Sequence, residues 1–313
     1  MIKKEWLKTV NPYFYVLPAF IFLTFLTLLP NIYSLYISFT NYSFPYHYEK
    51  FNFIGIANYL DIFKGEEFRV FVSIFFWTVL WAVCSVGFQL IIGLALALFL
   101  NQKGFCGQKI YRTLFIIPWA IPSFISVLMW GGLLNTSHGS INYLLHQYLG
   151  LSPIPWLDEP FWARVSVILV NLWLGFPFMM SIALGALQSI PQELYEAASV
   201  DGANKVQAFR FITLPMLRAA MLPVIISSFA FNFNNFTGIY LLTAGGPPVP
   251  GGPSAATPAG ATDILVSYTY KLAFGQANTA FYGLACAYAV IIFLLIATLS
   301  ALNFKLTGAF KEL

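Results

Sequence analysis

Three asparagines and a serine lie within one apolar stretch of this 313-residue chain, at Ser228, Asn232, Asn234 and Asn235. Ser228, Asn232 and Asn235 fall on one face if the stretch is a continuous helix. The rings between and beside them are Phe229, Phe231, Phe233 and Phe236. Amides among rings suit a sugar, because amides bond hydroxyl groups and rings stack on the apolar face of a sugar. An equally weighted alternative is that the amides hold neighbouring membrane helices together.

Two further stretches combine polar or helix-breaking residues with aromatic rings. Asn171 opens a segment that continues through Trp173, Gly175 and Pro177. Pro177 frees the carbonyl group near Trp173, and Gly175 allows a neighbouring helix to approach closely. The segment 118–123 carries two prolines, which predicts a twice-broken helix. Broken spans often mark a substrate path, whereas a lone Trp or Ser in such a place is more often packing.

The groups that would supply energy or covalent chemistry are missing from the sequence. No Gly-x-x-x-x-Gly-Lys-Ser/Thr segment occurs, so the chain has no phosphate-binding loop of its own. No set of His, Cys, Asp and Glu has metal-ligand spacing. The apolar stretches hold no Asp, Glu, Lys, Arg or His, although proton- and ion-driven carriers usually need such groups within the membrane. We therefore expect no catalytic site, cofactor or metal in this chain, and a source of energy outside it.

Composition places the chain among integral membrane proteins. Hydrophobic residues make up 59% and charged residues only 9%, against roughly 25% charged in soluble domains. The net charge of +4 does not suggest nucleic acid, because the positive residues lie between apolar stretches. Cys84, Cys106 and Cys286 predict free thiols and no disulfide framework.

Six apolar segments reach the roughly 20 residues that a bilayer-spanning helix needs. They cover approximately residues 13–40, 70–100, 113–134, 165–187, 219–244 and 280–302. The first is interrupted by Pro18 and Pro30 and is expected to be retained as a helix. Placing both termini in the cytoplasm leaves eleven Lys and Arg on that side and five on the other, as the positive-inside rule requires. The expected fold is an all-α membrane protein in which residues 1–313 form one transmembrane domain.

The segments expected outside the cell membrane differ in character. Residues 41–69 predict a polar and aromatic loop with a short helix near 58–63. Residues 135–164 predict an interfacial helix around 141–149 that ends at Gly150. Residues 245–253 are too rich in Gly and Pro for regular structure, and the piece 263–270 after them is amphipathic and suits a membrane surface.

A polar interruption near residues 190–215 predicts a compact helical knob on the cytoplasmic side. Pro191 is well placed as a first helical residue, and Gly202 can adopt the left-handed conformation that ends a helix. A second short helix is expected from about Asn204 to Ile212, and Pro215 then opens the next span. Such a knob is a handle that another protein can hold.

This knob resembles the EAA loop of ABC-importer permeases. The family pattern is Glu-Ala-Ala, three residues, Gly, nine residues, Ile, one residue and Leu-Pro, and every spacing is met. The matching residues are Glu196, Ala197, Ala198, Gly202, Ile212, Leu214 and Pro215. The resemblance implies that these residues couple the chain to a partner ATPase, which uses ATP and Mg, and that Glu196 takes charge-assisted bonds from it.

From the second span onward the chain looks like the MalF-like maltose/maltodextrin permeases, especially over 228–236, 257–260 and 262–270. The resemblance implies a sugar site built from three spans. Matched motif by motif, the site falls on Trp119, Ser123, Asn171, Leu174, Gly175, Phe178, Ser228, Asn232 and Asn235. The enterobacterial pattern has Tyr at the positions of Trp119 and Phe178, so ring stacking is kept and two hydroxyl groups are lost. A large external domain of that pattern is absent at 41–69.

Together these features predict the permease subunit of an ATP-driven importer that moves maltodextrin-type sugars by alternating access. The implied partners are a second, MalG-like permease, an ATPase dimer and an extracytoplasmic sugar-binding protein. The implied location is a bacterial or archaeal cytoplasmic (inner) membrane. Three alternatives stay open: a permease for another di- or oligosaccharide, a secondary sugar carrier that needs no ATPase, and a sugar-sensing or scaffolding membrane protein.

Overall fold

A computed structural model describes residues 2–102, 104–105, 107–249, 258–275 and 278–307. Within these ranges the structure is helical, with three isolated β-bridges and no strand. Five helical segments are long and apolar enough to cross a membrane, and the bent pair α5–α6 makes a sixth if it counts as one span. The expected all-α membrane fold is confirmed for the described residues. The chain divides into two compact units.

The first unit comprises residues 1–65 and 269–291. It holds α1 (Ile2–Leu23), the π-helical turn η1 (Thr24–Leu28), α2 (Leu29–Ile37) and α3 (Ala57–Ile62), with the end of α13 and the start of α14. The buried Asn58 side chain on α3 donates 2.8 Å hydrogen bonds to the carbonyl oxygens of Ser38 and Thr40. These two bonds hold α3, the short helix expected near 58–63, against the loop that follows α2.

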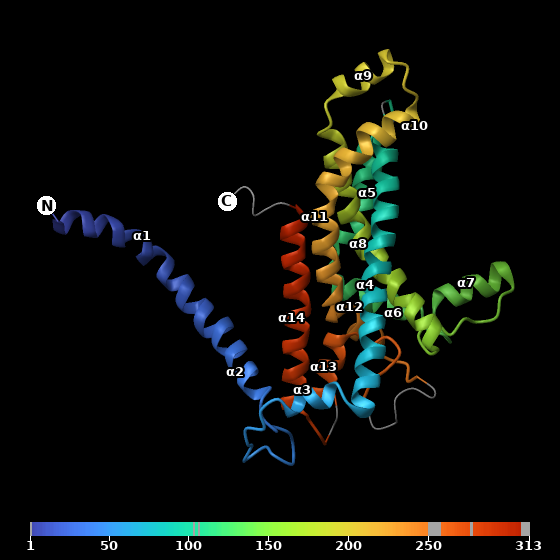
Figure 1. The fold of residues 1–313 in the computed structure, drawn as a ribbon. Helices are drawn as coiled ribbons and strands as arrows, with labels where there is room; N and C mark the ends of the chain where they lie inside the picture. The colour runs from blue at the N-terminus through green and yellow to red at the C-terminus, as the bar shows by residue number, and fades with distance from the viewer. Residues whose placement is uncertain (1, 103, 106, 250–257, 276–277, 308–313) are drawn as a thin grey trace. The chain divides into compact units, whose positions relative to one another are not determined.

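The second unit comprises residues 66–268 and 292–313. Its helices are α4 (Gly65–Leu100), α5 (Gln108–Ala120), α6 (Ser123–Leu133), α7 (Ser140–Leu149), α8 (Pro160–Gln188), α9 (Gln192–Val200), α10 (Lys205–Ala208), α11 (Leu214–Phe233) and α12 (Phe236–Thr243), with parts of α13 (Leu265–Phe274) and α14 (Tyr282–Thr307). α8 contacts α5, α6, α11 and α12. In Figure 1, α9 and α10 lie at one end of this unit and α7 lies away from that end.

α4 and α8 approach closely where a glycine faces α8. A Cβ atom on Gly93 would lie 2.7 Å from the backbone nitrogen of Met180, so only glycine fits there. The buried core beside this contact consists of Met179, Met180, Ala183, Leu184, Leu217 and Met221, among others. Close packing of α4, α8 and α11 therefore occupies the part of the unit nearest the knob.

The prolines shape the helices differently from the expectation. The predicted break at Pro18 and Pro30 is wrong, because the helix continues through both, with the π-helical turn η1 just before Pro30. A second π-helical turn, η2 (Phe209–Thr213), likewise precedes Pro215. Proline has no N–H group to donate, and a wide π-helical turn lets the helix continue past it.

The separate helix expected from Asn204 to Ile212 is also wrong. The turn η2 joins α10 to α11, so that Lys205–Phe233 forms one continuous helical segment.

Two other spans depart from their predicted form. The predicted third span is broken once and not twice: Pro118 lies inside α5, and a bend of 89° falls between α5 and α6, next to Pro122. The predicted fifth span is interrupted, since α11 ends at Phe233 and α12 begins at Phe236. Asparagine side chains compete for backbone hydrogen bonds, and Asn235 does so here by accepting from the amide of Gly238.

α7 and the start of α13 lie away from the end that carries α9 and α10 (Figure 1). α7 ends at Gly150 in a left-handed conformation (φ +64°), as predicted. The piece 263–270 is not a surface element: Ile264, Leu265 and Tyr268 are fully buried. Asp263 is also buried, and its carboxylate accepts bonds from the Gly260 amide and the Ser267 hydroxyl. The part of the predicted Gly- and Pro-rich loop over 250–257 lies outside the described residues.

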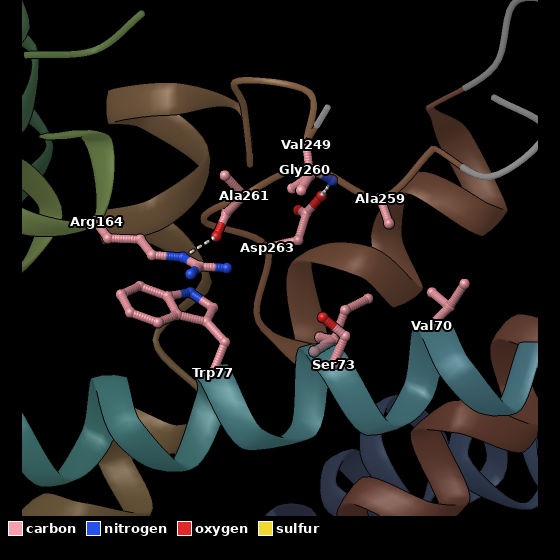
Figure 2. Close-up of a pocket in the computed structure, with 10 residues that line it drawn as sticks. Val70, Ser73, Trp77, Arg164, Val249, Ala259, Gly260, Ala261 and Asp263 are labelled. Carbon is pink, nitrogen blue, oxygen red and sulfur yellow. Dashed lines mark hydrogen bonds between the residues drawn. The ribbon is translucent and has the colours of Figure 1, made fainter. Parts of the chain in front are cut away.

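Arg164 binds the loop that leads into α13. Figure 2 shows the Arg164 guanidinium lying over the Trp77 ring, with 4.8 Å from its central carbon to the ring centroid. Its Nε donates a 2.8 Å hydrogen bond to the carbonyl oxygen of Ala261, and Trp77 Nε1 donates to that of Thr262 at 3.1 Å. Two side chains from α4 and α8 thus hold consecutive carbonyl groups of the loop.

We expect Arg164→Met to free this loop, because it removes a charged hydrogen bond and a stacked cation. The measurement is labelling of Ala259→Cys by a maleimide reagent, in a chain whose native cysteines are replaced by alanine. The labelling rate should be about tenfold higher with Arg164→Met than with Arg164 present. Arg69→Met removes an exposed arginine and serves as the matched control. Equal labelling rates in the two variants would contradict the assigned role.

Candidate functional site

A cavity of about 830 Å³ opens in the second unit between α5, α6, α8, α11 and α12. The structure brings together at its wall all nine residues that the motif resemblance implied for a site. They are Trp119, Ser123, Asn171, Leu174, Gly175, Phe178, Ser228, Asn232 and Asn235. Their location in one cavity is observed, whereas their role as ligands of a solute stays a prediction.

Three amide side chains form a hydrogen-bonded chain across two helices at this wall. Asn171 Nδ2 donates to Asn232 Oδ1 at 2.7 Å, and Asn235 Nδ2 donates to Asn171 Oδ1 at 3.3 Å. Asn232 Nδ2 donates to the carbonyl oxygen of Ser228 at 2.8 Å. The amides therefore do hold α8 and α11 together, as one of the two alternatives required.

The same amides keep hydrogen-bonding capacity for a ligand. Each Nδ2 carries two hydrogens, and the described residues accept only one of them from each of Asn171, Asn232 and Asn235. Asn232 and Asn171 are only 3% and 6% exposed, while Asn235 is half-buried. Asn235 is thus the amide most accessible from the cavity. The cluster can join two helices and bind a ligand at once.

The amides lie together because the helix breaks, and not because they share one helical face. Asn235 caps α12, whereas Asn232 belongs to the last turn of α11. The predicted single face through Ser228, Asn232 and Asn235 is therefore wrong in its geometry. Asn234, between them, is exposed and does not line the cavity.

Two side chains of α4 support the amide cluster from behind. Trp81 Nε1 donates a 3.0 Å hydrogen bond to the carbonyl oxygen of Asn232, and Gln89 Nε2 donates a 2.9 Å bond to that of Asn171. Gln89 also lines the cavity. The sequence reasoning missed both residues. A signal was available, because Gln89 is the single amide side chain in the predicted span 70–100.

Aromatic rings form an apolar part of the wall. The Trp119 and Phe178 rings lie 6.0 Å apart between centroids, at an interplanar angle of 43°. The ring of Trp119 is 57% exposed and that of Phe231, also at the wall, is 70% exposed. Exposed rings beside amides can stack on the apolar faces of a polyhydroxy compound while the amides bond its hydroxyl groups.

The cavity wall is electrically neutral. None of the described residues that line it is Asp, Glu, His, Lys, Arg, Cys or Tyr. The described part of the chain also holds no group of three His, Cys, Asp or Glu residues placed to bind a metal. A wall of this chemistry favours an uncharged ligand with many hydroxyl groups over an ion or an acid.

The predicted knob is a separate site, formed by α9, α10 and η2. Glu196 and Ala197 are exposed on α9, and Gly202 has φ +78°, the left-handed conformation predicted for it. Pro191 precedes α9 as its N-cap residue and does not open the helix as predicted. α10 begins with a capping box in which Asn204 and Gln207 exchange hydrogen bonds.

A few contacts tie the knob to the rest of the second unit. Tyr195 on α9 shares a 2.8 Å hydrogen bond with the hydroxyl group of Thr213 in η2. Ile212 packs against the buried core, while Leu214 is 45% exposed and Pro215 is exposed too. The knob also exposes apolar side chains. They are Leu194, Val200, Val206 and Phe211.

Residues 89–308 match the family described as "Binding-protein-dependent transport system inner membrane component". The chain belongs to this family. It is an ABC-importer permease, a multi-pass protein of the inner membrane, and its relatives include maltodextrin and maltose permeases. The permease resemblance stated from the motifs is thereby confirmed.

Three curated relatives illustrate the range of sugar permeases to which the chain is similar. The permease is 39% identical over 309 residues to the maltodextrin permease MdxF of Bacillus subtilis, covering 96% of this chain and 69% of that one. It is 38% identical to the galactooligosaccharide permease GanP of the same organism, covering 96% and 71%. It is 46% identical to the maltose/maltodextrin permease MalF of Vibrio parahaemolyticus, covering 83% of this chain and about half (49%) of that one.

A solved structure shares the fold. The permease superimposes on a chain of a bacterial ABC transporter that imports the acidic polysaccharide alginate, with a TM-score of 0.79. The match covers 99% of both chains at 23% sequence identity. This similarity extends over the whole length of the permease and concerns its fold alone.

The neighbouring asparagines provide a test of the two roles of the amide cluster. Asn232→Leu leaves the buried Asn171 amide without its partner, so we expect it to lower the free energy of unfolding by about 1–2 kcal/mol. Asn235→Ala removes the cap of α12 and a bond to Asn171, so it should also cost about 1 kcal/mol of stability. It should in addition lower solute uptake per assembled complex about tenfold, because a buried ligand hydroxyl group loses its partner. Asn234→Ala is the control. Thermal unfolding and uptake are measured on the same preparations.

An outcome in which Asn235→Ala and Asn234→Ala take up solute equally well per complex would remove Asn235 from the site. An unchanged unfolding temperature for Asn232→Leu would show that the bond to Asn171 does not stabilise the helix pair.

Proposed function

We propose that this chain is the membrane-spanning permease subunit of an ATP-driven importer of maltodextrin-type oligosaccharides. The observation that carries the proposal is the neutral cavity in which an amide cluster faces exposed aromatic rings. The nine predicted wall residues then serve as ligands of the sugar. The chemistry of the cavity wall matches a neutral glucan, whose hydroxyl groups bond amides and whose ring faces stack on Trp119, Phe178 and Phe231.

The chain does not hydrolyse ATP in this proposal. An ATPase dimer binds ATP and Mg and grips the knob through Glu196, Ala197, Ala198, Gly202, Ile212, Leu214 and Pro215. The exposed apolar side chains of α9 to η2 support such a contact, since apolar groups on a polar loop favour a protein partner. A second, MalG-like permease completes the transmembrane part, and an extracytoplasmic binding protein delivers the sugar.

Both termini and the knob face the cytoplasm in this proposal, and α7 faces the outside. The excess of Lys and Arg on the knob side supports this orientation. The mechanism is alternating access: closure of the ATPase dimer moves the knobs, and the spans rock around the cavity. Residues 1–313 act as one transmembrane domain in this motion.

The decisive experiment is uptake into vesicles that hold the assembled complex. We expect radiolabelled maltodextrin to accumulate only with ATP inside and the cognate binding protein outside. Uptake that persists without ATP would contradict the proposed class and favour a secondary carrier. A galactooligosaccharide is tested in parallel, because a galactooligosaccharide permease is nearly as similar to this chain as a maltodextrin permease. Preference for the galactooligosaccharide would replace the proposed substrate.

Coupling through the knob is tested at Gly202. A side chain in the left-handed conformation costs about 1–2 kcal/mol, and proline cannot adopt a positive φ. We expect Gly202→Arg and Gly202→Pro to insert normally and to lose sugar uptake while the partner ATPase still hydrolyses ATP. Gly202→Asn, which tolerates this conformation, is the control and should keep uptake. Normal uptake by Gly202→Pro at normal expression would show that the turn is not needed for coupling.

A further inference from the structure

We propose that Gln89 is a specificity-determining residue of the cavity and that it acts as a pair with Gly175. The inference rests on the proposed function, because the ligand whose shape it selects is the transported oligosaccharide. Gln89 comes from α4, the helix behind the wall, and Gly175 comes from α8 within the wall. Together they determine how far the cavity extends beside the amide cluster.

Gln89 is held in one position by its surroundings. Its side chain is 4% exposed and still reaches the cavity wall. Nε2 donates a 2.9 Å hydrogen bond to the carbonyl oxygen of Asn171. Gln89 therefore also positions the backbone of Asn171, whose side chain makes two of the three bonds in the amide cluster.

Gly175 supplies the space that the Gln89 carboxamide occupies. A Cβ atom on residue 175 would lie 2.1 Å from Gln89 Nε2 and 2.2 Å from Cδ. These separations are far inside van der Waals contact, so any side chain at position 175 displaces the carboxamide. Both residues line the cavity. Displacement of the Gln89 side chain therefore changes the shape of the cavity beside the amide cluster.

Two explanations for the glycine at position 175 can be separated. If glycine is required because the sugar approaches its backbone, a methyl group obstructs the sugar whatever residue occupies position 89. If glycine is required because of Gln89, shortening Gln89 restores the space. The three atoms nearest to the built Cβ atom all belong to Gln89, which favours the second explanation.

The test compares four assembled complexes: wild type, Gly175→Ala, Gln89→Ala and the double variant. We expect Gly175→Ala to lower maltodextrin uptake per complex about tenfold or more, by overpacking. The double variant should regain uptake to within about threefold of Gln89→Ala. Gly185→Ala is the matched control on α8, because no atom lies within 4 Å of a Cβ atom built there. It should behave as wild type.

A second measurement distinguishes selection of the sugar from support of the fold. Gln89→Met keeps the length of the side chain and loses the bond to Asn171, whereas Gln89→Ala also enlarges the cavity. We expect Gln89→Ala to shift the ratio of KM values between a linear and a branched glucan in favour of the branched one, with little change in maximal rate. Gln89→Met should leave that ratio near the wild-type value.

Three results would overturn the inference. Full uptake by Gly175→Ala would show that the overlap is relieved without consequence. Failure of Gln89→Ala to rescue Gly175→Ala would assign the glycine to direct contact with the sugar. An unchanged KM ratio in Gln89→Ala would make Gln89 a packing residue. If the wild-type complex imports no glucan, the proposed function fails, and thermal unfolding of the same four chains still decides whether the two residues form a pair.

Discussion

Polar groups within a bilayer must find their hydrogen-bond partners inside the protein, and this requirement governs the second unit. Its helices are interrupted between α5 and α6 and between α11 and α12, where carbonyl groups lose their helical donors. Carbonyl groups inside a helix have a second lone pair and can accept a further bond. α4 supplies donors from a single helix: Trp77 to Thr262, Trp81 to Asn232 and Gln89 to Asn171. The three acceptors lie on three different segments. α4 therefore determines where the loop before α13, the end of α11 and the middle of α8 meet.

The interruptions themselves are what makes a cavity possible. Unbroken apolar helices would pack against one another and leave no polar wall. Here the bend between α5 and α6 places Trp119 and Ser123 beside α8, and the break after Phe233 brings Asn235 back to Asn171. Prolines preceded by π-helical turns have the opposite effect, since the helix stays continuous through Pro30 and Pro215.

The cavity and the knob share the same two helices. α8 carries Asn171 and Gly175 and leads into α9, while α11 carries Asn232 and emerges from η2. Between the two sites lies the tightly packed core around Met180 and Leu217, in which Gly93 allows α4 to touch α8. Close-packed cores move as units and not by gradual deformation. In the proposed mechanism, a displacement of the knob is thus transmitted along α8 and α11 to the amide cluster.

The sequence by itself determined the membrane class, the positions of most helices and the left-handed turn at Gly202, and its resemblance to a permease family indicated the nine residues that meet at the cavity. Hydrophobic stretches and turn residues act locally, so they can be interpreted without a tertiary structure. The sequence did not determine whether a proline or an asparagine would interrupt its helix. That depended on tertiary partners: Asn235 leaves the helical path where Asn171 and the Gly238 amide bond it, whereas Pro30 and Pro215 are accommodated by wide turns. Only the tertiary structure could bring Gln89 against Gly175, because their contact joins helices far apart in the chain and depends on the absence of a single Cβ atom.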